Sequence, residues 1–207
     1  MPNHIHNRMT FQCDREKAAQ IKKEIANGES VIDFNKLIPM PKRLSTTQAI
    51  GNAPDAAMFA MTGKGYWFKD FPHALPINYN AEVFREYLKM ITNIRRYGFP
   101  TWYEWASEKW GTKWNAYDCG EENQRCSADQ IVFDTAWSSP KKIAIAISHK
   151  YAIRVLVEYV CEFADHGGLY TIYMGSEMGD RKFTADECEK LISEIAPDEI
   201  TIEDGDK

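Results

Sequence analysis

The chain lacks long hydrophobic runs and basic stripes, and these absences exclude several classes of protein. No apolar stretch in its 207 residues approaches the length of a membrane-spanning helix, which is about 20 residues. The first ten residues, MPNHIHNRMT, have no apolar core of the kind that a signal peptide carries. The formal net charge is −5, and a protein without a basic patch is not expected to bind nucleic acid in general. We therefore expect a cytoplasmic protein that does not contact a membrane.

Cysteine and catalytic motifs are also sparse. The five cysteines are widely spaced, which is typical of free thiols in a reducing compartment. Cys119 and Cys126 could form a disulfide or half of a zinc site, but no second ligand pair has zinc spacing. The sequence contains no phosphate loop, dinucleotide fingerprint, serine elbow or HExxH motif. It therefore predicts no cofactor and favours a non-enzymatic function.

The N-terminal residues have the pattern of a strand followed by a helix and a second strand. Residues 4–13 alternate between apolar and polar side chains, as a half-buried strand does. A helix is expected after Asp14, which can act as its N-cap, and Gly28 can accept the left-handed backbone that ends it. Residues 30–34, SVIDF, predict the second strand, which the following prolines end.

Regular patterns return at residue 130. We expect a strand at 130–137, a helix at 140–150 capped by Ser139, a strand at 153–163, a hairpin strand at 169–174 and a helix with the capping box Thr184/Glu187. The order up to the strand at 153–163 is the split βαβ pattern of a ferredoxin-like fold. The sequence therefore predicts an α+β protein with an antiparallel sheet and two helices on one face.

The segment between the two halves of this pattern is an insertion rich in tryptophan. We expect a single domain over residues 1–207, with a ferredoxin-like core at 1–40 plus 130–197, an insertion at 41–129 and an acidic tail at 198–207. Asn80 is the expected cap of the main helix of the insertion. The apolar stripe of that helix is expected to comprise Phe84, Tyr87, Leu88, Ile91 and Ile94.

Four stretches of the sequence are distinctive: MPNH at the start, DFNKLIPMP at 33–41, WGTKWNAYD at 110–118 and FDTAWSSP at 133–140. They resemble the YubB-like family, which comprises phage- and plasmid-borne bacterial proteins of unknown function with a ferredoxin-like domain. The resemblance implies the same fold and an origin in a mobile element. It assigns no catalytic residues.

The tryptophans of the insertion have two interpretations. They could form a recognition surface for a partner, since Trp dominates interface hot spots, or a plug that seals the insertion against the core. The plug is favoured because exposed aromatic clusters on a monomer promote aggregation. Asn115 is a plausible hydrogen-bond acceptor for a buried indole, and Trp102 and Trp105 are the rings expected to remain exposed. The candidate partner-binding residues are Trp102, Trp105, Trp110, Lys113, Trp114 and Asn115.

Polar residues on the expected sheet suggest a second kind of site. His4 and His6 alternate with the apolar residues of the first strand, and Asp134 and Glu158 occupy the same face of its two neighbours. Adjacent imidazole and carboxylate groups can bind a metal or transfer protons. Cross-strand ion pairs on a solvated or insertion-covered face explain the same pattern and are favoured here.

Three functions remain open. The favoured one is a mobile-element accessory protein that binds a protein of the host or of the element. The second is a small metal-dependent or acid–base enzyme that uses His4, His6, Asp134 and Glu158. The third is a single-stranded nucleic-acid binder that uses the aromatics of the insertion with Lys109, Lys113 and Arg125.

Overall fold

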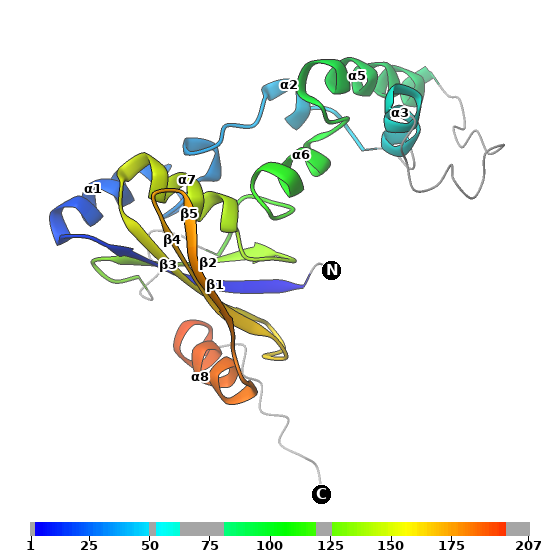
Figure 1. The fold of residues 1–207 in the computed structure, drawn as a ribbon. Coiled ribbons are helices and arrows are strands. Elements are labelled where there is room, and N and C mark those ends of the chain that lie inside the picture. The colour runs from blue at the N-terminus through cyan, green and yellow to red at the C-terminus, as the bar shows by residue number, and fades with distance from the viewer. Residues whose placement is uncertain (1–2, 50–52, 63–80, 119–125, 198–207) are drawn as a thin grey trace, which may run out of the picture. The chain divides into compact units, whose positions relative to one another are not determined.

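The computed structural model describes residues 3–49, 53–62, 81–118 and 126–197. The chain divides into two compact units. The first, the sheet unit, comprises Met1–Pro39 and Trp110–Lys207, and the second, the helical unit, comprises Met40–Lys109. Figure 1 shows both.

An antiparallel five-stranded sheet organises the sheet unit, which has an α+β ferredoxin-like fold. Its strands are β1 (His4–Gln12), β2 (Gln130–Ala136), β3 (Arg154–Cys161), β4 (Gly167–Tyr173) and β5 (Ser176–Lys182), in the spatial order β2-β1-β3-β4-β5. The prediction that β1 lies between β2 and β3 is confirmed. The hairpin strand β4 is also confirmed, and β5 adds an exposed edge strand that the sequence did not indicate.

Helices cover both faces of the sheet. The predicted helices α1 (Arg15–Ile25) and α7 (Lys141–Tyr151) lie on one face, and α8 (Ala185–Ile195) lies on the other (Figure 1). The apolar stripe of α8, which includes Leu191, packs against Val132 and Val160. The expectation that the second face is solvated or covered by the insertion is therefore wrong, because α8 buries its stripe there.

Two of the predicted helix caps are present, and two are not. Asp14 accepts a hydrogen bond from the Lys17 backbone amide, and the Thr184–Glu187 capping box is complete. Ser139 does not cap α7, because its hydroxyl contacts the Tyr170 hydroxyl at 2.8 Å instead. Gly28 has a left-handed backbone (φ 89°), but α1 already ends with Ala26 as its C-cap, so Gly28 shapes the following turn.

The predicted strand at residues 30–34 is absent. These residues form a loop that leads into a 3-10 helix, η1 (Phe34–Lys36), because the Asp33 carboxylate accepts a hydrogen bond from the Asn35 backbone amide. The free edge of β2 is instead occupied by Tyr117, whose backbone exchanges two hydrogen bonds with that of Asp134. The apolar residues of the segment still belong to the core, since Ile32 and Phe34 are fully buried.

The helical unit contains α2 (Lys42–Ser45), α3 (Ala53–Thr62), α5 (Ala81–Tyr97) and α6 (Trp102–Lys109). Its apolar core joins α3 and α5 through Ala53, Ala57, Met90 and Ile94. Phe84 and Leu88 of the expected stripe are 45% and 49% exposed. The stripe is rotated because Glu86 and Asn93 occupy the buried side of α5. The expected cap, Asn80, lies outside the described residues.

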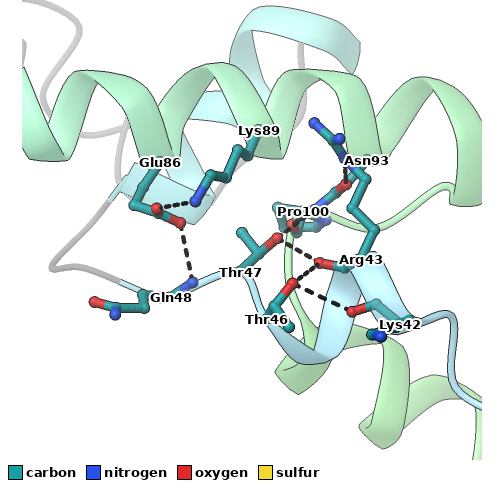
Figure 2. Close-up of polar contacts among 9 residues, drawn as sticks. All are labelled: Lys42, Arg43, Thr46, Thr47, Gln48, Glu86, Lys89, Asn93 and Pro100. Carbon is teal, nitrogen blue, oxygen red and sulfur yellow. Dashed lines mark hydrogen bonds and ion pairs between the residues drawn. The ribbon is translucent and has the colours of Figure 1, made fainter.

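A buried polar network ties the loop after α2 to α5 (Figure 2). The Asn93 side chain is completely buried, donates to the Thr47 hydroxyl and the Pro100 carbonyl, and accepts from Arg43 Nε at 2.9 Å. Glu86 accepts from the Gln48 backbone amide and pairs with Lys89. Every polar group of the Asn93 side chain has a hydrogen-bond partner. These hydrogen bonds compensate for the loss of water contacts when the side chain is buried.

Candidate binding surface

The WGTKWNAYD stretch begins with a buried structural anchor. Trp110 is 4% exposed, its indole N–H donates to the Ile38 carbonyl at 2.9 Å, and its ring packs edge-on against Phe34. Gly111 turns the chain with a left-handed backbone (φ 81°) that side chains resist. Trp110 is therefore buried, as the plug interpretation predicts, and these contacts lie within the sheet unit.

Asn115 also has a local structural role. Its side-chain oxygen accepts from the Phe34 backbone amide, and its amide donates to the Asp33 carboxylate at 2.7 Å. Burial raises the pKa of Asp33, but hydrogen bonds from Asn115 and Asn35 outweigh it and hold this pKa below the ordinary value. Asn115 thus fixes the loop that replaces the predicted strand, and Trp110 donates to a backbone carbonyl rather than to Asn115.

The two rings expected to remain exposed belong to α6 in the helical unit. Trp105 is 5% exposed, so the prediction for this ring is wrong. Trp102 is half-buried and packs edge-on against Tyr103. Trp105 and the adjacent Ala106 are the residues of α6 that are buried.

Among the described residues, the exposed tryptophans are Trp114 and Trp137, at 38% and 45%. Lys113 connects them, because its Nζ lies 4.6 Å from the centroid of each indole ring. Trp137 has a left-handed backbone (φ 76°), which is unfavourable for a bulky residue, and its backbone amide donates to the Asn3 carbonyl. We call Lys113, Trp114 and Trp137 the tryptophan surface.

A cavity of about 260 Å³ adjoins Trp137 in the sheet unit. Its lining includes Ile5, Trp137, Ser139, Tyr159, His166 and Tyr170. Burial raises the pKa of Tyr170, so its hydroxyl stays neutral and remains paired with Ser139. The cavity therefore offers aromatic walls with a few fixed hydroxyl groups.

Acidic residues of β5 neutralise the cation at the rim of this cavity. Lys141 Nζ lies 2.7 Å from Asp180 and 3.2 Å from Glu177, and 4.9 Å from the centroid of the Tyr170 ring. Burial lowers the pKa of Lys141, but the two carboxylates outweigh this effect and raise it overall. Lys141 is thus a charged group whose partners are already within the chain.

The polar residues of β1 pair with their neighbours as the sequence predicts. His6 Nδ1 lies 2.8 Å from the Asp134 carboxylate, and both side chains are almost completely buried. His4 is a separate group, since its ring contacts the Tyr117 hydroxyl at 2.9 Å. His6 and Asp134 lie opposite each other on adjacent strands, so the buried pair is a cross-strand contact of the kind that stabilises a sheet.

Glu158 belongs to an ion-pair cluster beneath α8. Arg8 bridges Glu158 at 2.7 Å and Glu194 of α8 at 2.6 Å. These contacts raise the pKa of Arg8 and keep it charged. Among the described residues, the four proposed enzyme residues do not form a group of three potential metal ligands.

The cations proposed for nucleic-acid binding are Lys109, Lys113 and Arg125. Lys109 belongs to the helical unit and lies over the Phe99 ring at 5.6 Å, whereas Lys113 belongs to the sheet unit. Arg125 lies outside the described residues. In the described parts of the chain, no helix has the length and apolar character needed to cross a membrane.

Comparisons with known proteins identify the class of the sheet unit. Residues 113–198 match the family model described as the ferredoxin-like domain in Api92-like protein. This region, which covers less than half of the chain, is therefore similar to the ferredoxin-like domain of Api92-like proteins. The tryptophan surface and the cavity beside it draw most of their residues from the matched region.

The crystal structure of protein Api92 from Yersinia pseudotuberculosis is similar to the chain. It has a TM-score of 0.45 and 11% sequence identity, over 89% of this chain and 99% of that chain. The chain matches no curated protein. The YubB-like assignment stays a prediction.

Trp137 is the residue whose importance sequence reasoning underestimated. It is not among the candidate binding residues of the sequence, yet it is the most exposed tryptophan in the described part of the chain. Its position directly before Ser-Ser-Pro, where a strand must end, is the signal that could have located it.

Proposed function

We propose that this protein is a non-enzymatic binding module of a phage or plasmid, and that it contacts a partner protein through the tryptophan surface. The observation that carries the proposal is the arrangement of Trp114 and Trp137 on either side of Lys113. Tryptophans at protein interfaces contribute large apolar areas and an indole N–H. The resemblance to YubB-like proteins supports the mobile-element origin.

The conformation of Trp137 strengthens the argument. A left-handed backbone at a bulky residue costs of order 1–3 kcal/mol, and the exposed indole recovers little of this through burial on the isolated chain. Strain at an exposed aromatic residue is typical of a side chain that is held in place for a ligand. The cation–π contacts with Lys113 fix the orientation of the ring in advance, which lowers the entropic cost of binding.

Charge around the surface favours a protein over nucleic acid. Nucleic-acid grooves combine stacking rings with a track of cations for the phosphates. Here Lys141 is neutralised by Glu177 and Asp180, and the chain carries a net charge of −5. Lys141 lines the same cavity as Trp137, and because two carboxylates balance its charge it offers a phosphate backbone little attraction.

The test uses variants that remove the rings without disturbing the core. Trp114→Ala and Trp137→Gly each remove one exposed indole, and glycine accepts the left-handed backbone of position 137. Met178→Ala is the matched control, because it removes an exposed apolar side chain from β5. Each tagged protein captures partners from a bacterial host lysate, and the affinity of a captured protein is then measured after purification.

The proposal requires a protein that binds the wild type and Met178→Ala equally and binds both tryptophan variants at least roughly tenfold more weakly, as expected for interface hot spots. Single-stranded DNA is titrated in parallel over a salt series. Binding to DNA that weakens steeply with salt and depends on the tryptophans would replace the proposal with the nucleic-acid alternative. Capture that is the same for all variants would refute it.

A further inference from the structure

The turn between β3 and β4 brings together three side chains with different metal-binding atoms. Cys161 ends β3, and Asp165 and His166 lie just before β4. One ligand atom from each, a sulfur, an oxygen and a nitrogen, lies within 4.8 Å of the other two. No other group of three such residues occurs in the described ranges, which omit residues 119–125 and the other gaps.

The backbone of this turn holds the three residues in a fixed arrangement. The Cys161 amide donates to the His166 carbonyl at 2.9 Å, and the Ala164 amide donates to the Cys161 carbonyl at 2.8 Å. Ala164 has a left-handed backbone (φ 52°) that makes the reversal tight. The spacing of the ligands is therefore set by the hairpin itself and does not depend on a flexible loop.

Contacts within the group show that the ligand atoms face one another. His166 Nδ1 lies 2.6 Å from Asp165 Oδ1, and Cys161 Sγ lies within 4.8 Å of a ligand atom of each of these two residues. The hydrogen bond with His166 lowers the pKa of Asp165, so its carboxylate is ionised near neutral pH. Burial raises the pKa of the Cys161 thiol, which is therefore protonated in the metal-free chain.

We propose that Cys161, Asp165 and His166 bind a zinc ion. Zn²⁺ accepts thiolate, imidazole and carboxylate ligands, and ligand atoms of one tetrahedral ion are roughly 3.3–3.7 Å apart. The observed separations of up to 4.8 Å reach this geometry through small side-chain rotations. On binding, the thiol proton is released to solvent and a Zn–S bond forms.

The position of the group relative to the cavity distinguishes it from a closed structural site. His166 also lines the cavity beside Trp137, and both Asp165 and His166 are more than half exposed. Three protein ligands leave a fourth position for water or a ligand, which is the arrangement of an open zinc site. The zinc site is separate from the tryptophan surface, so one proposal can fail without the other.

The experiment uses the full chain after treatment with a chelator and a phosphine reductant. Co²⁺ is titrated first, because a thiolate–Co²⁺ charge-transfer band reports a cysteine ligand directly, and Zn²⁺ is then added as a competitor. His166→Ala and Asp165→Asn change exposed side chains and leave the core intact. Cys161→Ser removes the sulfur, and His4→Ala and Cys13→Ser are the matched controls, since both lie elsewhere in the sheet unit.

The proposal expects one Co²⁺ per chain, a charge-transfer band that Zn²⁺ abolishes, and affinity reduced at least roughly tenfold in His166→Ala and Asp165→Asn. Both controls should match the wild type. Absence of the band overturns the proposal, as does a band that either exposed variant leaves unchanged or that Cys13→Ser removes. These results hold even if Cys161→Ser fails to fold.

Discussion

The most informative perturbation is the removal of the Trp110 ring, because it separates a structural anchor from a binding residue within one short segment. Trp110 is 4% exposed and packs edge-on against Phe34, which in turn contacts Phe133 in the core. Trp114, only four residues away, is 38% exposed. The two rings should therefore respond very differently to the same substitution.

The magnitude follows from the buried area. A fully buried indole removes about 150–250 Å² from water, and about 25 cal/mol per Å² converts this to roughly 4–6 kcal/mol. Partial burial in the unfolded chain reduces the figure, so we expect Trp110→Ala to lower the free energy of unfolding by about 3–5 kcal/mol. Trp110→Phe keeps most of the ring but leaves the Ile38 carbonyl without the indole donor, which should cost about 1–2 kcal/mol.

The matched variant is Trp114→Ala, which removes an exposed ring and one cation–π contact and should cost about 0.5–1 kcal/mol. Unfolding in urea is followed by far-UV circular dichroism, since fluorescence would change with the tryptophans themselves. Hydrogen exchange of the β2 amides gives an independent measure for the sheet unit. A loss below about 1 kcal/mol for Trp110→Ala, or equal losses for both alanine variants, would refute the assignment of Trp110 as the anchor.

Three further predictions concern polar contacts of the side chains. Asn93→Leu should destabilise the helical unit by about 2–4 kcal/mol, since it leaves the partners of a buried amide unpaired; urea unfolding measures this against Thr92→Ala. Asn115→Ala should raise the lowered pKa of Asp33. The wild type should therefore have a higher free energy of unfolding than Asn115→Ala, and this difference should be fully present above the ordinary pKa of 3.8. The difference should disappear as the pH falls through the lower pKa of Asp33 in the folded chain, which unfolding curves at several pH values would check. Thr184→Ala should cost about 1 kcal/mol by breaking the capping box of α8, and Thr184→Ser should retain it, as thermal melts would show.

Some elements could be predicted because their signals are local. Alternation along β1 and the Asp14 cap of α1 depend on side chains within a few residues of each other. The placement of His6 and Asp134 on one face of neighbouring strands also followed from the pattern, because a ferredoxin-like order places β2 beside β1, whereas the register that sets them opposite each other came from the structure. In these cases the chain has one favourable way to bury its apolar side.

Other elements depended on which segment of the chain takes a given place in the fold, and a single sequence does not show which segment does so. The apolar residues Ile32 and Phe34 fit a strand, but Tyr117 occupies the available edge of β2, and Asp33 caps a 3-10 turn. The face of β1 that carries Arg8 has a polar pattern, yet α8 covers it, with Arg8 bonded to a glutamate of that helix. A strand can form only where a partner edge remains unpaired.

The sequence by itself determined the α+β class, most helices and the central place of β1, because hydrophobic period and caps act over short distances. Only the tertiary structure decided which tryptophans are exposed, because composition and spacing are similar for Trp110 and Trp114 while their surroundings differ. It likewise decided that Cys161, Asp165 and His166 converge, since a left-handed residue in the hairpin turn folds the chain back on itself. Local pattern selects the elements, and the packing of distant segments decides which side chains face water.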